Sequence, residues 1–380
     1  MKIGIISPYD VLSMAEGASI RVFELAKGLN ACGASVYVLH HGATKFLNSN
    51  FKLINFKSYN PLPNTGNYFH PLNPSYPSQL CDFIREYNPD IIQCEQPWSI
   101  FPTLFFARHF RIPCALDEHN VEFLWTLHAS KVPFLAPFIF ILEKIATYYS
   151  SFILTTSEVD KNLLKRIYNV PEEKMYLVPN GVDIDRLCLK SSTNSQIRKK
   201  LGFDISVKLV LFHGVMSAKQ NYEAAKLILD TISPKITDAT FLIVGKNPPK
   251  WLEMKAKLRQ NVVVIGYVPS IEEYVSIADV CIAPIKKGSG TRLKILEYLA
   301  AGKPIVATCK AVEGLPIIDK FNALLFNEVN DDYINAIKKV LIDKSFAEKL
   351  GCNAKILAQR FDWKDIGNKL YKKYLSLLDQ

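Results

Sequence analysis

The segment 286–308 has the residue types of an anion-binding site. Four small residues open it and leave backbone N–H groups accessible: Gly288, Ser289, Gly290 and Thr291. Arg292 and Lys294 follow at the predicted start of a helix, where the helix dipole opposes cations unless an anion binds among them. Free amides, the positive end of the dipole and two cations together predict a phosphate site.

The predicted helix also carries a carboxylate. Its apolar residues recur at i,i+4 spacing, and Gly302 and Pro304 end it before a short apolar strand at 305–307. Glu297 is the only acid in the segment and is a candidate acceptor for hydrogen bonds from sugar or ribose hydroxyls. An ordinary amphipathic helix with solvated charges is the alternative, because a Gly/Ser loop before a helix is a weak signal.

The elements around this segment alternate between strands and helices. Strands are predicted at 209–212, 239–244, 262–265 and 280–283, with a helix at 219–232 after the first of them. In a parallel sheet, the carboxyl ends of the strands share one edge, and ligands bind there. The residues expected to line this edge, besides the Gly288 loop, are Gly214, Lys219, Gly245 and Gly266.

The N-terminal half has the same alternation. A strand at 3–7, a polar turn at 16–19, a helix and a strand at 35–40 form a βαβ unit. Gly17 lies at the carboxyl end of the first strand, where its backbone could approach a phosphate or sugar. A plain turn is the alternative.

A second polar cluster follows a predicted strand at 112–116. The sequence DEHNVE at 117–122 places three acids around His119. Such a cluster could bind a metal, but no further His or Cys lies at ligand spacing, so a binding or proton-handling histidine is favoured. The pair Asp183 and Asp185 forms a DxD, for which a metal role is again the less favoured alternative.

Two segments lack a clear pattern. Residues 44–78 are rich in proline and have no sustained period, which predicts a substrate-facing loop. Residues 132–142 (VPFLAPFIFIL) are strongly apolar, too short to span a bilayer and interrupted by Pro133 and Pro137. We expect the start of a buried helix there, and a membrane-surface patch is the alternative.

Composition limits the classes of function. The chain has 380 residues, 49% hydrophobic and 22% charged, as expected for two folded domains. It has no long apolar tract and no signal-peptide pattern, so we expect a cytoplasmic protein. The net charge of +10 arises entirely after residue 180, yet no polybasic run predicts nucleic-acid binding. No CxxC occurs among the 8 cysteines, which favours reduced thiols.

Four motifs carry a resemblance over nearly the whole chain. They are GSGTRLKILE at 288–297, AAGKPIVAT at 300–308, PNGVD at 179–183 and DEHNVE at 117–122. Together they resemble the retaining glycosyltransferases of family 4, which have the GT-B fold of two Rossmann-like domains facing across a cleft. The first two motifs are specific to that family, and the others are supportive.

The resemblance implies a domain organisation and a reaction. An acceptor-side domain is expected at 1–185 and a domain for a nucleotide-diphosphate sugar at 186–360, with a last helix at 361–380 packing back on the first. The sugar would pass to a glycan, lipid-linked or glycoconjugate acceptor with retention of anomeric configuration. Neither a cofactor nor a metal is implied, and peripheral contact with the inner face of a membrane is left open.

The resemblance also assigns roles to residues. Glu297 would bind the nucleotide ribose, and Lys219 would neutralise the leaving diphosphate with the amides of 289–291. His119 would lie near the reacting sugar, and Gly17 would belong to the glycine loop that closes on the phosphate. The nucleotide base would be bordered by Gly266 and Tyr267.

This chain departs from the family pattern at two positions. Ser289 replaces the first acid of an E-x7-E pair, which puts the contacts to the donor sugar in question, and Val215 replaces a frequent arginine. Asn221 matches a subgroup of the family that has an asparagine in this loop. A catalytically silent sugar-nucleotide-binding protein and another GT-B enzyme, such as a nucleotide-sugar epimerase, are therefore the alternatives.

Overall fold

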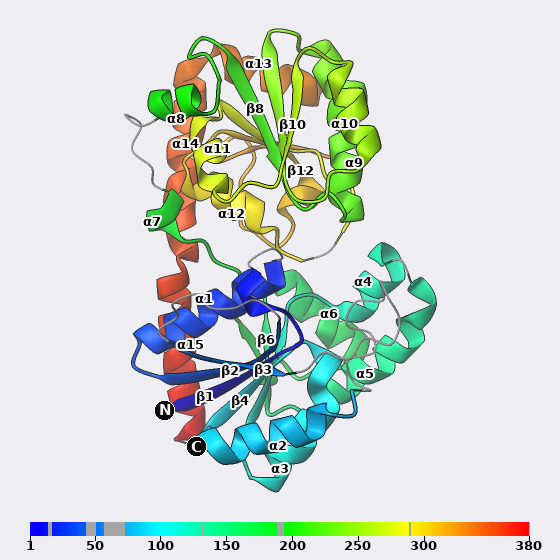
Figure 1. The fold of residues 1–380 in the computed structure, drawn as a ribbon, viewed down its shortest axis with the longest axis vertical. Coiled ribbons are helices and arrows are strands. Elements are labelled where there is room, and N and C mark those ends of the chain that lie inside the picture. Colours follow the sequence, from blue (N-terminus) through cyan, green and yellow to red (C-terminus); the bar gives the residue numbers. More distant parts are fainter. Residues whose placement is uncertain are drawn as a thin grey trace. The chain divides into compact units, whose positions relative to one another are not determined.

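The computed structural model describes residues 1–13, 17–42, 51–56, 73–130, 132–187, 194–288 and 290–379. The chain divides into two units. The first contains residues 1–180, 289–291 and 363–380, and the second contains residues 181–288 and 292–362. Each unit is built around one parallel sheet (Figure 1).

The sheet of the first unit has the strand order β3-β2-β1-β4-β5-β6-β7. Its central strands are buried along their whole length, as expected when helices cover both faces of a parallel sheet. The strands are β1 (Lys2–Ser7), β2 (Ser35–His41), β3 (Lys52–Phe56), β4 (Ile91–Glu95), β5 (Cys114–Glu118), β6 (Phe152–Thr155) and β7 (Met175–Leu177).

Helices cover both faces of this sheet. In Figure 1, α1 and α15 lie on one side and α2, α3 and α5 on the other. The α-helices are α1 (Gly17–Ala31), α2 (Tyr76–Tyr87), α3 (Ile100–His109), α4 (Glu122–Ala129), α5 (Ala136–Tyr149), α6 (Glu158–Tyr168) and α15 (Trp363–Leu378). Short 3-10 turns are η1 (Val11–Ser13), η3 (Pro97–Ser99), η4 (Pro133–Leu135) and η5 (Glu172–Lys174).

The C-terminal helix α15 packs closely on α1 within the first unit. A Cβ added to Gly367 would lie 2.7 Å from the Cα of Gly28, so the two backbones meet where neither residue has a side chain. Further along α15, the buried Tyr374 donates a hydrogen bond to Gln93 on β4. The helix thus reaches the centre of the sheet.

The sheet of the second unit has the strand order β10-β9-β8-β11-β12-β13. The strands are β8 (Lys208–His213), β9 (Ala239–Val244), β10 (Val262–Gly266), β11 (Val280–Ala283), β12 (Ile305–Thr308) and β13 (Leu324–Phe326). The α-helices are α7 (Ile184–Leu187), α8 (Asn194–Lys200), α9 (Lys219–Leu227), α10 (Lys250–Lys257), α11 (Ile271–Ile277), α12 (Leu293–Ala300), α13 (Asp331–Ile342) and α14 (Lys344–Ala358). A π-helical turn, η7 (Ile228–Ile232), and the 3-10 turns η8 (Ser233–Lys235), η9 (Cys309–Val312) and η10 (Gln359–Phe361) complete the unit.

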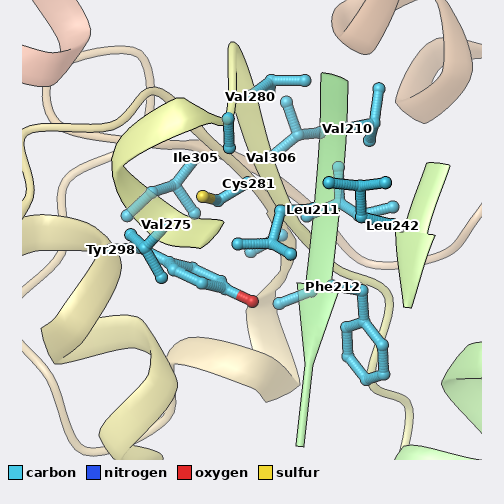
Figure 2. Packing of buried hydrophobic residues seen from close by; sticks show 14 of the residues in the cluster. Val210, Leu211, Phe212, Leu242, Val275, Val280, Cys281, Tyr298, Ile305 and Val306 are labelled. Atoms are coloured by element: carbon cyan, nitrogen blue, oxygen red, sulfur yellow. The ribbon is translucent and has the colours of Figure 1, made fainter. Parts of the chain in front are cut away.

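The core of the second unit joins the sheet to α12. Figure 2 shows Val210, Leu211 and Phe212 of β8 packed beside side chains of the neighbouring strands and Tyr298 of α12. The Tyr298 side chain is fully buried, and its hydroxyl accepts a hydrogen bond from the backbone N–H of His213 at 3.2 Å. This bond joins the C-terminal half of α12 to the end of β8.

The predicted fold class of two Rossmann-like parallel sheets is confirmed. Several local predictions were wrong. Within 44–78, residues 52–56 form the edge strand β3 and the segment ends inside α2, while 43–50 and 57–72 lie outside the described residues. The short strand β13 was not predicted, and the predicted helix 219–232 changes to π-helical geometry after Leu227.

The apolar segment 132–142 is only partly the buried helix that its composition predicts. It forms η4 and the first half of α5, and Ile139 and Leu142 face the core. Phe134, Phe138 and Ile141 are exposed. The helix is apolar on two faces, only one of which the fold covers.

Buried carboxylates join the helices of the first unit. Glu143 of α5 accepts hydrogen bonds from the backbone N–H groups of Glu122 and Phe123 at 2.7 and 3.0 Å and from the Tyr168 hydroxyl at 2.6 Å. It therefore links α4, α5 and α6. Burial raises the pKa of Glu143 to about 7, although these hydrogen bonds oppose the shift.

The raised pKa of Glu143 predicts a pH-dependent stability. The pKa of Glu143 in the folded protein exceeds the usual 4.5. The contribution of the protonated Glu143 carboxyl to the free energy of unfolding is therefore fully present below about pH 4.5 and is lost as the pH rises through about 7. Glu143→Gln imitates the protonated acid, so between pH 5 and 8 its stability relative to wild type should increase by about 3 kcal/mol. Native-state hydrogen exchange of amides in the first unit measures this difference. Glu348→Gln, at an exposed position of α14, is the control, and equal pH slopes in wild type and Glu143→Gln would refute the assignment.

Candidate active site

Backbone crowding shapes the carboxyl edge of the second sheet. Gly214 follows β8 with φ +153°, and Gly245 follows β9 with φ +152°. A Cβ on Gly245 would lie 1.8 Å from the carbonyl oxygen of Gly214, a separation that no side chain tolerates. These two glycines let the loops after β8 and β9 approach one another directly.

Hydrogen bonds connect the loop after β10 to the same edge. The N–H of Gly245 donates to the carbonyl of Gly266 at 2.8 Å, and the N–H of Met216 donates to the carbonyl of Lys246 at 2.9 Å. Tyr267 is exposed, and the ammonium of Lys246 lies 4.7 Å from the centre of its ring. The predicted residues Gly214, Gly245, Gly266 and Tyr267 therefore belong to one group of loops.

A buried ammonium lies at the centre of this edge. Lys294, in the first turn of α12, is 9% exposed, and its Nζ lies 2.6 Å from Oδ1 of Asn221 and 4.4 Å from the centre of the Phe212 ring. A Cβ on Gly214 would lie 2.6 Å from this Nζ, so the glycine also leaves room for the ammonium. Burial and the nearby Arg292 lower the pKa of Lys294 to about 7, against the opposing effect of Glu297.

The segment before α12 has features of an anion site. In the described ranges no side chain caps α12, which begins directly after Arg292. Burial lowers the pKa of Arg292 to about 10. Gly290 has φ +75°, and the buried Thr291 hydroxyl has no hydrogen-bond partner within the described part of the chain. Ser289 lies outside the described residues.

Lys219 differs from these residues in its position. It is the first residue of α9 and is exposed, and the described residues offer its ammonium no hydrogen bond or ion pair. Two residues later on the same helix, Asn221 is buried against Lys294. The structure thus brings Asn221, rather than Lys219, into contact with the predicted phosphate-binding cation.

Glu297 lies one turn after Lys294 and faces His213 at the end of β8. Its Oε2 is 3.0 Å from Nε2 of His213, an ion-pair distance without hydrogen-bond geometry. Burial alone would raise the pKa of Glu297, but His213, Arg186 and Lys294 together hold it below the usual value. The carboxylate is therefore ionised at neutral pH and can only accept hydrogen bonds.

The second predicted cluster lies at the carboxyl edge of the first sheet. His119, directly after β5, places its Nε2 2.7 Å from Oε2 of Glu95 at the end of β4. The Nδ1 atom of His119 is buried and has no partner among the described residues. Glu95 also accepts a hydrogen bond from Gln93 at 2.6 Å. Burial and Asp117 raise the pKa of Glu95, while His119 and Arg21 oppose the rise.

Glu95, Asp117 and His119 could together hold a metal ion, because their ligand atoms lie within 4.8 Å of one another. The charge of Asp117 is, however, already compensated by two hydrogen bonds from the buried guanidinium of Arg21, at 2.8 and 2.9 Å. A divalent cation here would face that guanidinium at short range. The donor set therefore fits an internal ion-pair network better than a metal centre.

The remaining predicted residues fall elsewhere. Gly17 is the first residue of α1, the helix that carries Arg21, and the residues directly before it lie outside the described part. Asp183 of the DxD accepts a hydrogen bond from the backbone N–H of Arg186 at 3.0 Å and so stabilises the start of α7.

Sequence reasoning assigned no role to His213, Glu95 or Arg21. His213 directly follows the strand predicted at 209–212, and this position at a carboxyl edge was the available signal for it. Glu95 is the last residue of β4. Arg21 lies within a helix that reads as amphipathic, where nothing in the sequence marks a buried charge. Its partner Asp117 is 96 residues away in the chain.

Comparisons with known proteins agree with this architecture. A family model described as "Glycosyltransferase Family 4" matches residues 15–186, and one described as "Glycosyl transferases group 1" matches residues 207–343. An uncharacterised glycosyltransferase of Methanocaldococcus jannaschii is 28% identical over 303 residues, which cover 75% of each chain. The UDP-Gal:alpha-D-GlcNAc-diphosphoundecaprenol alpha-1,3-galactosyltransferase of Escherichia coli is 26% identical over 53% of this chain and 54% of its own.

Solved structures share the fold over the whole chain. Sucrose-phosphate synthase from Thermosynechococcus elongatus has a TM-score of 0.83 at 20% identity and covers 100% of this chain and 99% of its own. Anabaena HepE in complex with UDP-glucose has a TM-score of 0.78 at 18% identity, with 99% of both chains covered. This chain therefore belongs to the group 1, family 4-like glycosyltransferases of the GT-B fold, as its two parallel sheets, its motifs from Asp117 to Thr308 and the two family models together show.

Proposed function

We propose that this glycosyltransferase moves a sugar from a nucleotide-diphosphate donor to a glycan or lipid-linked acceptor, with retention of configuration and without a metal. The observation that carries the proposal is the buried ammonium of Lys294 at the uncapped start of α12. A nucleotide-sugar donor is also present in the HepE complex and in the name of the E. coli relative. That relative's acceptor is a polyprenyl diphosphate sugar.

The proposed chemistry depends on charge at the leaving group. As the bond from the anomeric carbon to the donor phosphate breaks, negative charge grows on the departing diphosphate. Lys294, Arg292 and the backbone amides at the start of α12 would stabilise this charge without reorganising, since the fold already holds them in place. Protein cations in this position would do the work that a metal does in other transferases.

Separate roles are proposed for Glu297 in the second unit and for His119 in the first. The ionised carboxylate of Glu297 would accept hydrogen bonds from the ribose hydroxyls, with His213 restricting its orientation. Because Glu95 occupies Nε2 of His119, the Nδ1 atom remains available for a hydroxyl of the reacting sugar. Glu95 would then act as a positioning residue for His119.

The donor site can be tested by calorimetry with UDP, GDP and ADP and their common sugar conjugates. One nucleotide should bind, and Glu297→Ala should weaken that binding by about 1.5–3 kcal/mol, the scale of a hydrogen bond to a charged group. Glu348→Ala is the surface control. If no nucleotide binds the folded protein, the chain is not a nucleotide-sugar transferase.

Sugar transfer should also proceed unchanged in EDTA. If EDTA abolishes transfer and manganese restores it, the metal site of Glu95, Asp117 and His119 becomes the favoured interpretation.

The two candidate cations can be separated by substitution. Lys294→Met keeps the buried volume but removes the charge, and we expect nucleoside diphosphate affinity to fall by about 10–100-fold. Lys219→Ala should cost less than about tenfold, because an exposed charge is screened by solvent and salt. Calorimetry with the nucleotide that binds wild type gives both values. A larger loss for Lys219→Ala would return the diphosphate role to that residue.

The role of His119 can be tested by comparing binding with turnover. His119→Ala should retain donor affinity while losing turnover, and Glu95→Gln should lower turnover by about tenfold or more. Because Glu95 acts through the histidine, Glu95→Gln should also displace the pH profile of the rate constant, which a purely structural defect would not do. Glu86→Gln, an exposed acid of α2, serves as the control. Wild-type turnover in His119→Ala contradicts the assignment.

A further inference from the structure

Two helices of the first unit expose large apolar side chains in stripes. On α3, Phe101 and Phe105 are one turn apart, and Phe105 is 67% exposed. Arg108 continues the same stripe a further turn along. The opposite face of α3 is buried through Leu104 and Ala107, so the outer aromatics are not needed for the core.

The second stripe runs along η4 and α5. Phe134, Phe138 and Ile141 repeat at helical spacing, and Phe134 is 75% exposed. Tyr148 and Tyr149 extend the stripe to the end of α5. Four aromatic rings on one outer face are unusual for a surface that meets only water.

The two stripes belong to one surface. The guanidinium of Arg108 on α3 lies 4.7 Å from the ring centre of Tyr149 on α5, which joins the stripes directly. Figure 1 shows α3 and α5 on the same side of the first sheet. We call this surface the α3–α5 face, made up of Phe101, Phe105, Arg108, Phe134, Phe138, Ile141, Lys144, Tyr148 and Tyr149.

The exposed charges on α3 and α5 themselves have one sign. Residues 101–150 contain four acids, namely Asp117, Glu118, Glu122 and Glu143, and all of them are buried. The basic residues Arg108, Arg111 and Lys144 of the same stretch are exposed. At the end of α5, the ammonium of Lys174 donates to the carbonyls of Thr147 and Tyr148. Among the described residues of these helices, every exposed full charge is therefore positive.

We propose that the α3–α5 face docks on the anionic surface of a lipid bilayer. Aromatic and aliphatic side chains flanked by lysine and arginine are the combination that inserts at a headgroup boundary, and each basic residue adds attraction to anionic lipid. A second copy of the chain fits less well, because a two-fold interface would place Arg108 and Lys144 among like charges. No helix within the described ranges is long and apolar enough to cross a bilayer, so docking here would be peripheral.

This proposal deepens the proposed function, on which it rests for one consequence. A lipid-linked acceptor stays in the membrane, so an enzyme held at the surface meets it in two dimensions. Docking can nevertheless be measured without any sugar transfer. The two proposals can therefore fail separately.

The test is flotation of the full-length protein with phosphatidylcholine vesicles that contain or lack phosphatidylglycerol. We expect binding to the anionic vesicles, weaker binding at high salt and little binding to phosphatidylcholine alone. Phe105→Ser combined with Ile141→Ser should lower vesicle affinity at least about tenfold through lost apolar burial. Arg108→Glu combined with Lys144→Glu should lower it by roughly fivefold or more per charge.

Matched controls use exposed positions of the second unit. Ile342→Ser with Ile356→Ser removes comparable exposed apolar side chains, and Lys349→Glu reverses an exposed charge. These variants should float like wild type.

Equal flotation of control and α3–α5 variants, or no flotation of wild type, overturns the proposal. A dimer in light scattering that Phe105→Ser abolishes overturns it too, because a second copy would then cover the face. Transfer to a soluble acceptor analogue in a variant that no longer floats leaves the proposed function intact.

Discussion

A buried ammonium constrains the carboxyl edge of the second sheet. Among the residues that the structure describes, a neutral amide and an aromatic ring are the groups in direct contact with Nζ of Lys294, which is poor compensation for a charge removed from water. Holding it there requires Asn221 at the start of α9, Phe212 at the end of β8 and a glycine at 214 to leave space. Burial and the nearby Arg292 lower the pKa of Lys294, and an anionic ligand would oppose this shift by favouring the charged form.

The carboxyl edge of the first sheet also holds buried charges, but these charges have partners within the protein. Acids end both β4 and β5, but Arg21 binds Asp117 through two hydrogen bonds, and His119 contacts Glu95. The charges at this edge are therefore largely balanced within the protein. Positive charge stays unbalanced at the carboxyl edge of the second sheet. That sheet belongs to the part of the chain after residue 180, which carries the whole net charge of +10. This asymmetry favours the proposed assignment of a diphosphate to the second unit and of a neutral sugar hydroxyl to His119.

Most of the fold could be predicted from sequence because its strands are short apolar runs that end in glycine or polar residues. The strands at Leu209, Ala239 and Val280 follow that pattern, and the structure has them within one or two residues of prediction. The edge strand β3 escaped prediction because Lys52–Phe56 alternates weakly inside a proline-rich stretch. The contacts of the candidate site were harder to predict, since Lys294 and Asn221 are 73 residues apart and only the packing of α12 on β8 brings them together. No periodicity or propensity encodes such a pair.

The same reasoning explains why the buried helix predicted for the segment 132–142 is only partly correct. A helix that is apolar all round predicts burial, and composition cannot say whether the fold supplies a partner for each face. Here Ile139 and Leu142 meet the core, while Phe138 and Ile141 do not. The buried Glu143 is the informative residue, because its acid points inward to cap α4 although the outer face would solvate it at no cost. A helix that buries its carboxylate Glu143 and exposes Phe138 and Ile141 is suited to contact with an apolar surface that carries negative charge, such as the proposed anionic bilayer.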